Sequence, residues 1–164
     1  MFEVQVLSVG SNIALGKPSS QSSTLNNLFA NLVVDGKVNT YSHTNVAVGS
    51  PVWWKVDLGI EFPTQAVTIL NRWCGSSADP NGCLCHLSFA TLSLIDSEGV
   101  IVGTQSIGDT CGKQELLFDD FMVPTPAPTA TNFSLVGQGS CRDETYNYYS
   151  FIYSAFLPPR TTET

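Results

Sequence analysis

Residues 51–59 read Pro-Val-Trp-Trp-Lys-Val-Asp-Leu-Gly, and this stretch decides the fold. From Trp54 to Leu58, apolar and polar side chains alternate, which is typical of a strand with one buried face and one exposed face. The same alternation occurs at residues 3–6, 66–70 and 91–95. Turn-forming Asp, Asn, Gly and Pro residues separate these segments, and no segment has a sustained helical period. We therefore predict an all-β fold of the sandwich or jelly-roll type.

The composition bounds both the size of the fold and the kind of partner. A chain of 164 residues has room for one domain of ordinary size, and its 43% hydrophobic and 13% charged residues favour a packed core. Fourteen acidic against seven basic residues give a net charge of -7. This balance disfavours a nucleic-acid partner and an anionic membrane surface. No apolar run approaches the ~20 residues that span a bilayer.

Cysteine usage indicates the compartment. Five cysteines, with frequent Ser and Thr and few Lys, are typical of an extracellular module. The first residues lack the basic start and the long apolar middle of a signal peptide. We therefore expect a piece of a longer secreted or cell-surface protein, with cytosolic residence as the alternative.

The composition changes near residue 122. Residues 123–131 are rich in Pro and Thr, which predicts a stiff extended linker. Residues 132–164 begin a new pattern that resembles the opening of an apple-like (PAN-like) module but is too short to complete one. The predicted organisation is therefore a sandwich over 1–122, a linker over 123–131, and an incomplete second module with a tail over 132–164.

Several separate pieces occur in an order that resembles one family. The pieces are residues 12–23 as the opening strand, 33–36 (Val-Val-Asp-Gly) as a calcium turn, 53–59 as the central strand, and 67–72 (Val-Thr-Ile-Leu-Asn-Arg) as the next strand. In this order they resemble the F-type lectins, fucose-binding domains of the discoidin (coagulation factor V/VIII type C) group. The resemblance runs from about residue 12 to about residue 118. It implies a discoidin-like, galactose-binding-domain-like jelly-roll β-sandwich.

The closing strand of that family, of the form Cys-Glu-Val-Glu-Val, has no counterpart after Phe118. Residues 2–6, Phe-Glu-Val-Gln-Val, have this form at the other end of the chain. Our hypothesis is that residues 1–8 are the closing strand of a preceding repeat, or serve as that strand in a permuted order. Val4 and Val6 should then face the core.

The resemblance also implies a calcium site. Its side-chain ligands carry over to Asp35 and Thr40, its carbonyl ligands to Leu32 and Lys37, and its carboxylate from the closing strand to Glu3. Such hard oxygen ligands are those that Ca²⁺ prefers. The alternative is an ordinary Asp-Gly turn.

A sugar site built from one histidine and two arginines is implied as well. His43 matches the histidine, and Arg72 matches the first arginine, whose planar guanidinium can hold two vicinal sugar oxygens. The second arginine falls on His86, which can donate one hydrogen bond but lacks the fork. On the inserted loop, Trp73 is expected to offer a stacking face and Asp79 an acceptor. The alternatives are a surface ion pair for Arg72, a capping or core role for His43, and partial core burial for Trp73.

The cysteines cluster in the same region. We predict disulfides between Cys74 and Cys83 and between Cys85 and Cys111, which leaves Cys141 to pair within the second module. A zinc site formed by Cys74, Cys83, Cys85 and His86 is the alternative. The two cysteines of a family disulfide fall on Phe2 and Tyr41, so both are absent here together.

These observations favour a calcium-supported carbohydrate-binding module of the fucose type, with glycans or glycoproteins as partners. The alternatives are an adhesion domain that binds protein or phospholipid, and a structural repeat whose sugar site has decayed. The chain contains neither a Gly-x-Ser-x-Gly elbow nor a His-Glu-x-x-His motif, and we therefore do not expect an enzyme.

Overall fold

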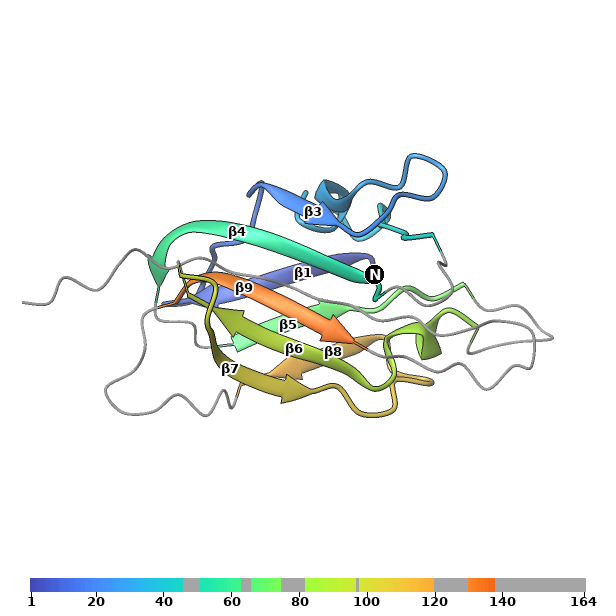
Figure 1. Ribbon diagram of the computed structural model, residues 1–164. Coiled ribbons are helices and arrows are strands. Elements are labelled where there is room, and N and C mark those ends of the chain that lie inside the picture. The colour runs from blue at the N-terminus through green and yellow to red at the C-terminus, as the bar shows by residue number, and fades with distance from the viewer. Residues whose placement is uncertain (46–50, 63–65, 75–81, 97, 120–129, 138–164) are drawn as a thin grey trace, which may run out of the picture.

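Two antiparallel sheets form the fold. The computed structural model describes residues 1–45, 51–62, 66–74, 82–96, 98–119 and 130–137 (Figure 1). The four-stranded sheet has the order β2-β1-β5-β8, with β1 at Glu3–Ser8, β2 at Ser11–Asn12, β5 at Ala66–Leu70 and β8 at Glu115–Phe118. The five-stranded sheet has the order β3-β4-β9-β6-β7, with β3 at Ser19–Gln21, β4 at Trp53–Phe62, β9 at Ala130–Gly137, β6 at Ala90–Ile95 and β7 at Ile101–Ser106. Two short 3₁₀ helices, η1 at Ala30–Val33 and η2 at Leu84–Leu87, complete the described elements.

Alternating side chains explain why these segments pair as strands. In β4, Trp54, Val56 and Leu58 are fully buried, and the residues between them face outward. Val6 and Ile69 from the other sheet belong to the same apolar core. Two sheets that bury their inner faces against each other make a sandwich, and the all-β prediction is confirmed.

Strand β1 packs its apolar side chains into the core. Val4 and Val6 are both 0% exposed, as the closing-strand hypothesis requires. The strand lies inside its sheet and pairs antiparallel with β5, with Glu3 opposite Leu70 and Val6 opposite Val67. The origin of residues 1–8 in a preceding repeat stays a prediction.

The predicted boundary between residues 131 and 132 is wrong. Residues 130–137 form β9, which pairs with β4 on one side and with β6 on the other (Figure 1). Without β9, the facing edges of β4 and β6 would leave a row of backbone donors and acceptors unpaired. The sandwich therefore extends to Gly137. Residues 123–129, 138–164 and Cys141 lie outside the described residues, and so does the predicted start of a second module beyond 137.

Both predicted disulfides are present. Cys74 bonds to Cys83 with a Cα–Cα distance of 5.2 Å, and Cys85 bonds to Cys111 with a Cα–Cα distance of 4.3 Å. The zinc alternative is therefore wrong, because a zinc site requires free thiolates and these are consumed. Within the described part of the chain, no helix has the length and apolarity to cross a bilayer.

Candidate functional site

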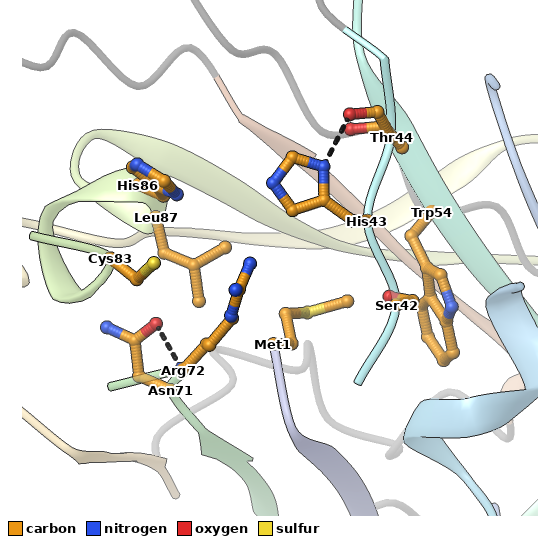
Figure 2. A pocket seen from close by; sticks show the side chains of 10 residues that line it. All are labelled: Met1, Ser42, His43, Thr44, Trp54, Asn71, Arg72, Cys83, His86 and Leu87. Atoms are coloured by element: carbon orange, nitrogen blue, oxygen red, sulfur yellow. Dashed lines mark hydrogen bonds between the residues drawn. The ribbon is translucent and has the colours of Figure 1, made fainter. Parts of the chain in front are cut away.

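One pocket gathers three of the predicted sugar ligands. Figure 2 shows His43, Arg72 and His86 around it, although they come from three separate segments of the chain. His43 lies in the loop before β4, Arg72 directly follows β5, and His86 lies on η2. The full lining consists of Met1, Ser42, His43, Thr44, Trp54, Asn71, Arg72, Cys83, His86 and Leu87.

Backbone hydrogen bonds hold the His43 segment in place. The His43 N–H donates to the Leu28 carbonyl at 3.1 Å, and the His43 carbonyl accepts from the Leu25 N–H at 2.9 Å. Behind this segment, the buried Trp54 donates its indole N–H to the Ala30 carbonyl at 2.8 Å, which ties η1 to β4. The loop is thus fixed to the sandwich on both sides.

The His43 ring has a defined tautomer. Its Nδ1 lies 2.9 Å from the Thr44 carbonyl oxygen, and a carbonyl oxygen only accepts, so Nδ1 must carry the proton (Figure 2). Burial lowers the pKa of His43 below its usual value; the Thr44 carbonyl opposes this effect, and the charge of Arg72 adds to it. The neutral ring therefore keeps Nε2 as a hydrogen-bond acceptor.

Neighbouring residues hold both the backbone and the guanidinium group of Arg72. The buried Asn71 side chain accepts a hydrogen bond from the Arg72 N–H at 2.9 Å, and it donates to the Leu84 carbonyl at 2.7 Å and to the Lys113 carbonyl at 3.2 Å. The Arg72 Cζ lies 3.9 Å from the ring centroid of Tyr41. The described part of the chain contains no ion pair of Arg72, and the surface ion-pair alternative stays a prediction, because residues 75–81 lie outside the described residues.

His86 completes the group. Its ring centroid lies 6.4 Å from that of His43, with the two planes at 82°. Figure 2 shows the Arg72 side chain reaching between Met1 and Leu87 toward these two rings. Burial, and to a lesser extent the Arg72 charge, lower the pKa of the Met1 amino group to about 5, so this group adds no charge at pH 7.

The two other predicted sugar contacts have different outcomes. Trp73 is 52% exposed and follows Arg72 directly, so the expectation of a partly buried core position is not met. It does not line the pocket and could contact only a ligand that extends beyond it. Asp79 lies outside the described residues.

Sequence reasoning missed the residues that hold the site together. Asn71 is one of them, and its signal in the sequence is a polar residue at the end of an apolar strand, which indicates a structural hydrogen bond. Tyr41 was noted only for a missing cysteine. No sequence pattern indicates that its ring lies under a guanidinium 31 positions away.

The predicted calcium turn is a compact cluster of oxygens. The Thr40 hydroxyl lies 3.0 Å from both carboxylate oxygens of Asp35 and 3.2 Å from the Lys37 carbonyl. The Lys37 N–H donates to Asp35 Oδ1 at 2.9 Å, and its ammonium group lies 3.7 Å from Oδ2. Leu32, in η1, lies three positions before Asp35. The loop thus brings the predicted side-chain ligands together.

Glu3 faces this loop from β1. Its side chain is 1% exposed, and within the described structure neither of its carboxylate oxygens makes a hydrogen bond of good geometry, although the Gly36 backbone N–H lies near enough to favour the charged form. Burial first, and then the nearby Asp35 charge, raise the pKa of Glu3 to about 7, while the Gly36 backbone N–H opposes the rise. An unpartnered buried carboxylate is costly unless it is protonated or neutralised.

The donor set fits calcium better than a transition metal. No group of three or more His, Cys, Asp and Glu side chains that could hold a metal occurs in the described ranges. A cation here would therefore be bound by two carboxylates, from Glu3 and Asp35, together with hydroxyl and carbonyl oxygens. All of these are hard oxygen donors, which suit Ca²⁺.

Solved structures place the chain among lectin modules. No family model and no curated protein matches the sequence. The lectin domain of lectinolysin, in complex with Lewis B antigen, is 30% identical, with a TM-score of 0.63 over 79% of this chain and 86% of that one. A Streptococcus pneumoniae fucose binding module, SpX-3, is 29% identical, with a TM-score of 0.60 over 76% of this chain and 85% of that one. The chain therefore belongs to the same family of lectin modules as the lectinolysin domain, and it has an F-type lectin-like, discoidin-like β-sandwich fold.

Proposed function

We propose that this chain is a non-catalytic, carbohydrate-binding module that recognises fucose-type sugars on glycans or glycoproteins. The single observation that carries the proposal is the convergence of His43, Arg72 and His86 on one pocket. The likeness to structures described as a fucose binding module and as a complex with Lewis B antigen supports the sugar class.

The polar groups of the pocket suit two neighbouring sugar oxygens. The Arg72 guanidinium donates hydrogen bonds to both oxygens, and the Nε2 atom of His43 accepts a hydrogen bond from one hydroxyl. His86 supplies a third polar contact from η2. The Met1 and Leu87 side chains give the pocket an apolar wall. Such a wall suits the apolar face of a pyranose and the methyl group of a 6-deoxy sugar such as fucose.

We also propose that calcium binding near Glu3 and Asp35 stabilises the sugar site. Glu3 and Asp35 would hold the ion, which would supply positive charge against their carboxylates and so would keep β1 and the loop at 35–40 together. Tyr41, Ser42 and His43 follow this loop directly. Calcium binding at these residues would therefore stabilise the segment that carries His43.

Two disulfides and a glycan ligand support an extracellular location. Disulfides persist in oxidising compartments, and glycoproteins are displayed there. We propose that the module belongs to a secreted or cell-surface protein.

A glycan array with and without calcium tests the proposal. The wild-type protein is compared with Arg72→Ala and with the control Lys55→Ala, which removes a cation that does not line the pocket. We expect calcium-dependent signals on fucosylated glycans for the wild type and the control, and their loss in Arg72→Ala. Equal binding by Arg72→Ala would refute the site. Absence of any glycan signal would favour the adhesion or decayed-repeat alternatives.

A further inference from the structure

Three side chains form a stack behind the sugar pocket. The rings of Phe2 and Tyr41 meet edge to face, with centroids 5.9 Å apart and planes at 78°. The Arg72 Cζ lies 3.9 Å from the centroid of the same Tyr41 ring. Tyr41 therefore makes an edge-to-face contact with Phe2 and has Arg72 over its ring.

The stack has a consequence for hydrogen bonding. All five N–H donors of a guanidinium lie in its plane, so a ring that packs on its face consumes none of them. A carboxylate partner would occupy the fork, but Arg72 has no such partner in the described ranges. Tyr41 thus limits the tilt of the guanidinium without using its donors.

The backbone of Arg72 is fixed independently. The Asn71 side chain accepts from the Arg72 N–H and ties this point to the Leu84 and Lys113 carbonyls. Since Asn71 fixes where the side chain starts, the remaining freedom lies in the arginine torsions. The contact with the Tyr41 ring restricts them.

We propose that Tyr41 is a positioning residue for glycan binding, which orients the Arg72 guanidinium toward the sugar. This proposal rests on the proposed function. Phe2 and Tyr41 stand where the resemblance implies a disulfide, so here a non-covalent ring pair joins the residue before β1 to the loop before His43. That pair also provides the surface on which Arg72 stacks.

The first test needs no glycan. A guanidinium above an aromatic ring experiences its ring current, so the side-chain NMR resonances of Arg72 should lie upfield of their usual positions. We expect the upfield shift in the wild type, in Tyr41→Phe and in Phe2→Leu, and its loss in Tyr41→Leu. Unshifted Arg72 resonances in the unmodified protein would overturn the proposal, whatever the variants do.

The second test measures affinity for a soluble Lewis B oligosaccharide, together with the thermal midpoint. Tyr41→Leu should weaken binding about tenfold, which is within the range of a desolvated cation–π contact. Tyr41→Phe should restore affinity to within about twofold, because it keeps the ring face. Phe2→Leu is the matched control: it should lower the thermal midpoint but change affinity by less than about threefold.

The outcomes separate the two proposals. If the wild type binds no glycan but shows the upfield Arg72 shift, the proposed function is wrong, whereas the contact between Arg72 and Tyr41 is confirmed. If the wild type binds and Tyr41→Leu binds equally well, the positioning role is overturned. A loss of affinity in Phe2→Leu as large as in Tyr41→Leu would also overturn it, because general destabilisation would then explain both.

Discussion

At the residue scale, His43 shows how one backbone contact sets the polarity of a binding group. The Thr44 carbonyl accepts a hydrogen bond from the Nδ1–H group. The ring therefore offers its Nε2 atom to the pocket as an acceptor, whereas Arg72 offers only donors. A hydroxyl group can satisfy both partners at once, since it donates to one and accepts from the other. A site with both the His43 acceptor and the Arg72 donors therefore favours hydroxyl groups over groups that can only accept hydrogen bonds.

We predict that glycan affinity falls on acidification through protonation of His43. Its pKa lies below the usual histidine value, so affinity should be constant around neutral pH and should decline only at pH values below the usual histidine range, where Nε2 becomes protonated and can only donate. The charged and titratable groups facing it are Arg72, His86 and the Met1 amino group. Titration calorimetry across pH should show the acid-side loss in His86→Gln but not in His43→Gln. If affinity still falls at acidic pH in His43→Gln, another titrating group causes the loss.

Sequence reasoning found the residues that meet the ligand but not those that position them. His43, Arg72 and His86 were predicted from short motifs, and the structure brings all three together. Asn71 and Tyr41 act through contacts with residues far away in the chain. Such contacts depend on the tertiary fold, which local patterns do not encode.

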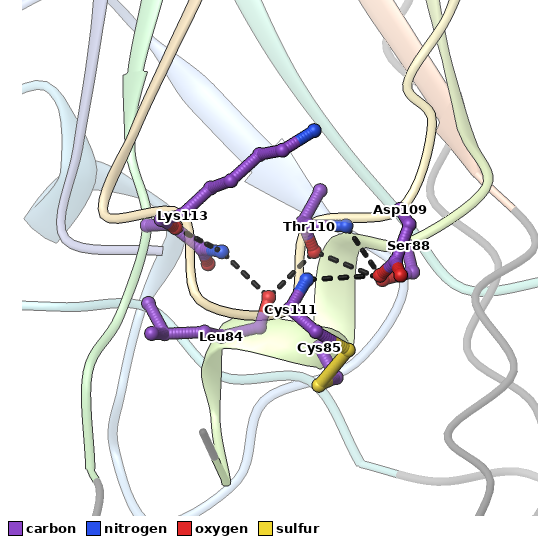
Figure 3. The surroundings of a disulfide bond; sticks show 8 residues. Leu84, Cys85, Ser88, Asp109, Thr110, Cys111 and Lys113 are labelled. Atoms are coloured by element: carbon purple, nitrogen blue, oxygen red, sulfur yellow. Dashed lines mark hydrogen bonds between the residues drawn. A yellow bond between two sulfur atoms is a disulfide. The ribbon is translucent and has the colours of Figure 1, made fainter. Parts of the chain in front are cut away.

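At the element scale, η2 is held to the sandwich at several points. The Cys85–Cys111 disulfide joins it to the loop before β8, and the Leu84 carbonyl accepts from both Asn71 and Thr110 (Figure 3). The Ser88 hydroxyl also hydrogen-bonds Asp109 and Thr110. These contacts fix the helix that carries His86.

We predict unequal effects from removing the two disulfides. Replacing Cys85 and Cys111 by Ser should cost roughly 3 kcal/mol of unfolding free energy and weaken glycan binding, because it frees a 26-residue loop and releases η2. Replacing Cys74 and Cys83, which close only nine residues, should cost less. Urea unfolding of the two double variants measures both. An equal or larger loss from the shorter loop would contradict this account.

Strands with a clear alternation of apolar and polar residues were predicted correctly, whereas the strand that follows a Pro- and Thr-rich segment was not. β1, β4, β5 and β6 follow period-two patterns that were recognised. β9 was missed because the Pro- and Thr-rich residues before it indicated a linker, although Phe133 and Leu135 alternate with polar neighbours. A local pattern cannot show that two strands elsewhere need a partner between them.

The correction at β9 leads to a prediction. A chain ending at residue 122, the boundary predicted from composition, lacks the strand between β4 and β6. It should be insoluble or bind hydrophobic dyes, whereas the full chain should unfold cooperatively. Circular dichroism and thermal unfolding of both chains provide the measurement. A cooperatively folded 1–122 fragment would show that β9 is dispensable.

At the scale of the whole molecule, the proposed calcium ion joins the four-stranded sheet to the loop that leads into the pocket. Without the ion, the raised pKa of Glu3 means that the folded state binds more protons than the unfolded state between about pH 4.5 and 7. The stabilisation that protonated Glu3 gives the folded state is therefore fully present below the pKa that Glu3 has in the unfolded state. It is lost as the pH rises through the folded pKa.

We predict opposite effects of Glu3→Gln in the two conditions. In a chelator at pH 8, Glu3→Gln should be as stable as the wild type or more stable, because it removes a buried charge. With calcium at a hundredfold excess over its Kd, the wild type should gain about 2.7 kcal/mol and Glu3→Gln much less. Thermal unfolding with and without calcium measures this. No calcium shift in the wild type would remove the metal from the account.

The most direct test of the central claim is a crystal structure of the protein with a fucosylated oligosaccharide and calcium. The account predicts a sugar in the pocket, with neighbouring oxygens in hydrogen-bond contact with the Arg72 guanidinium and one hydroxyl on Nε2 of His43. A sugar bound elsewhere on the sandwich, with Arg72 and His43 making no contact to it, would contradict the account.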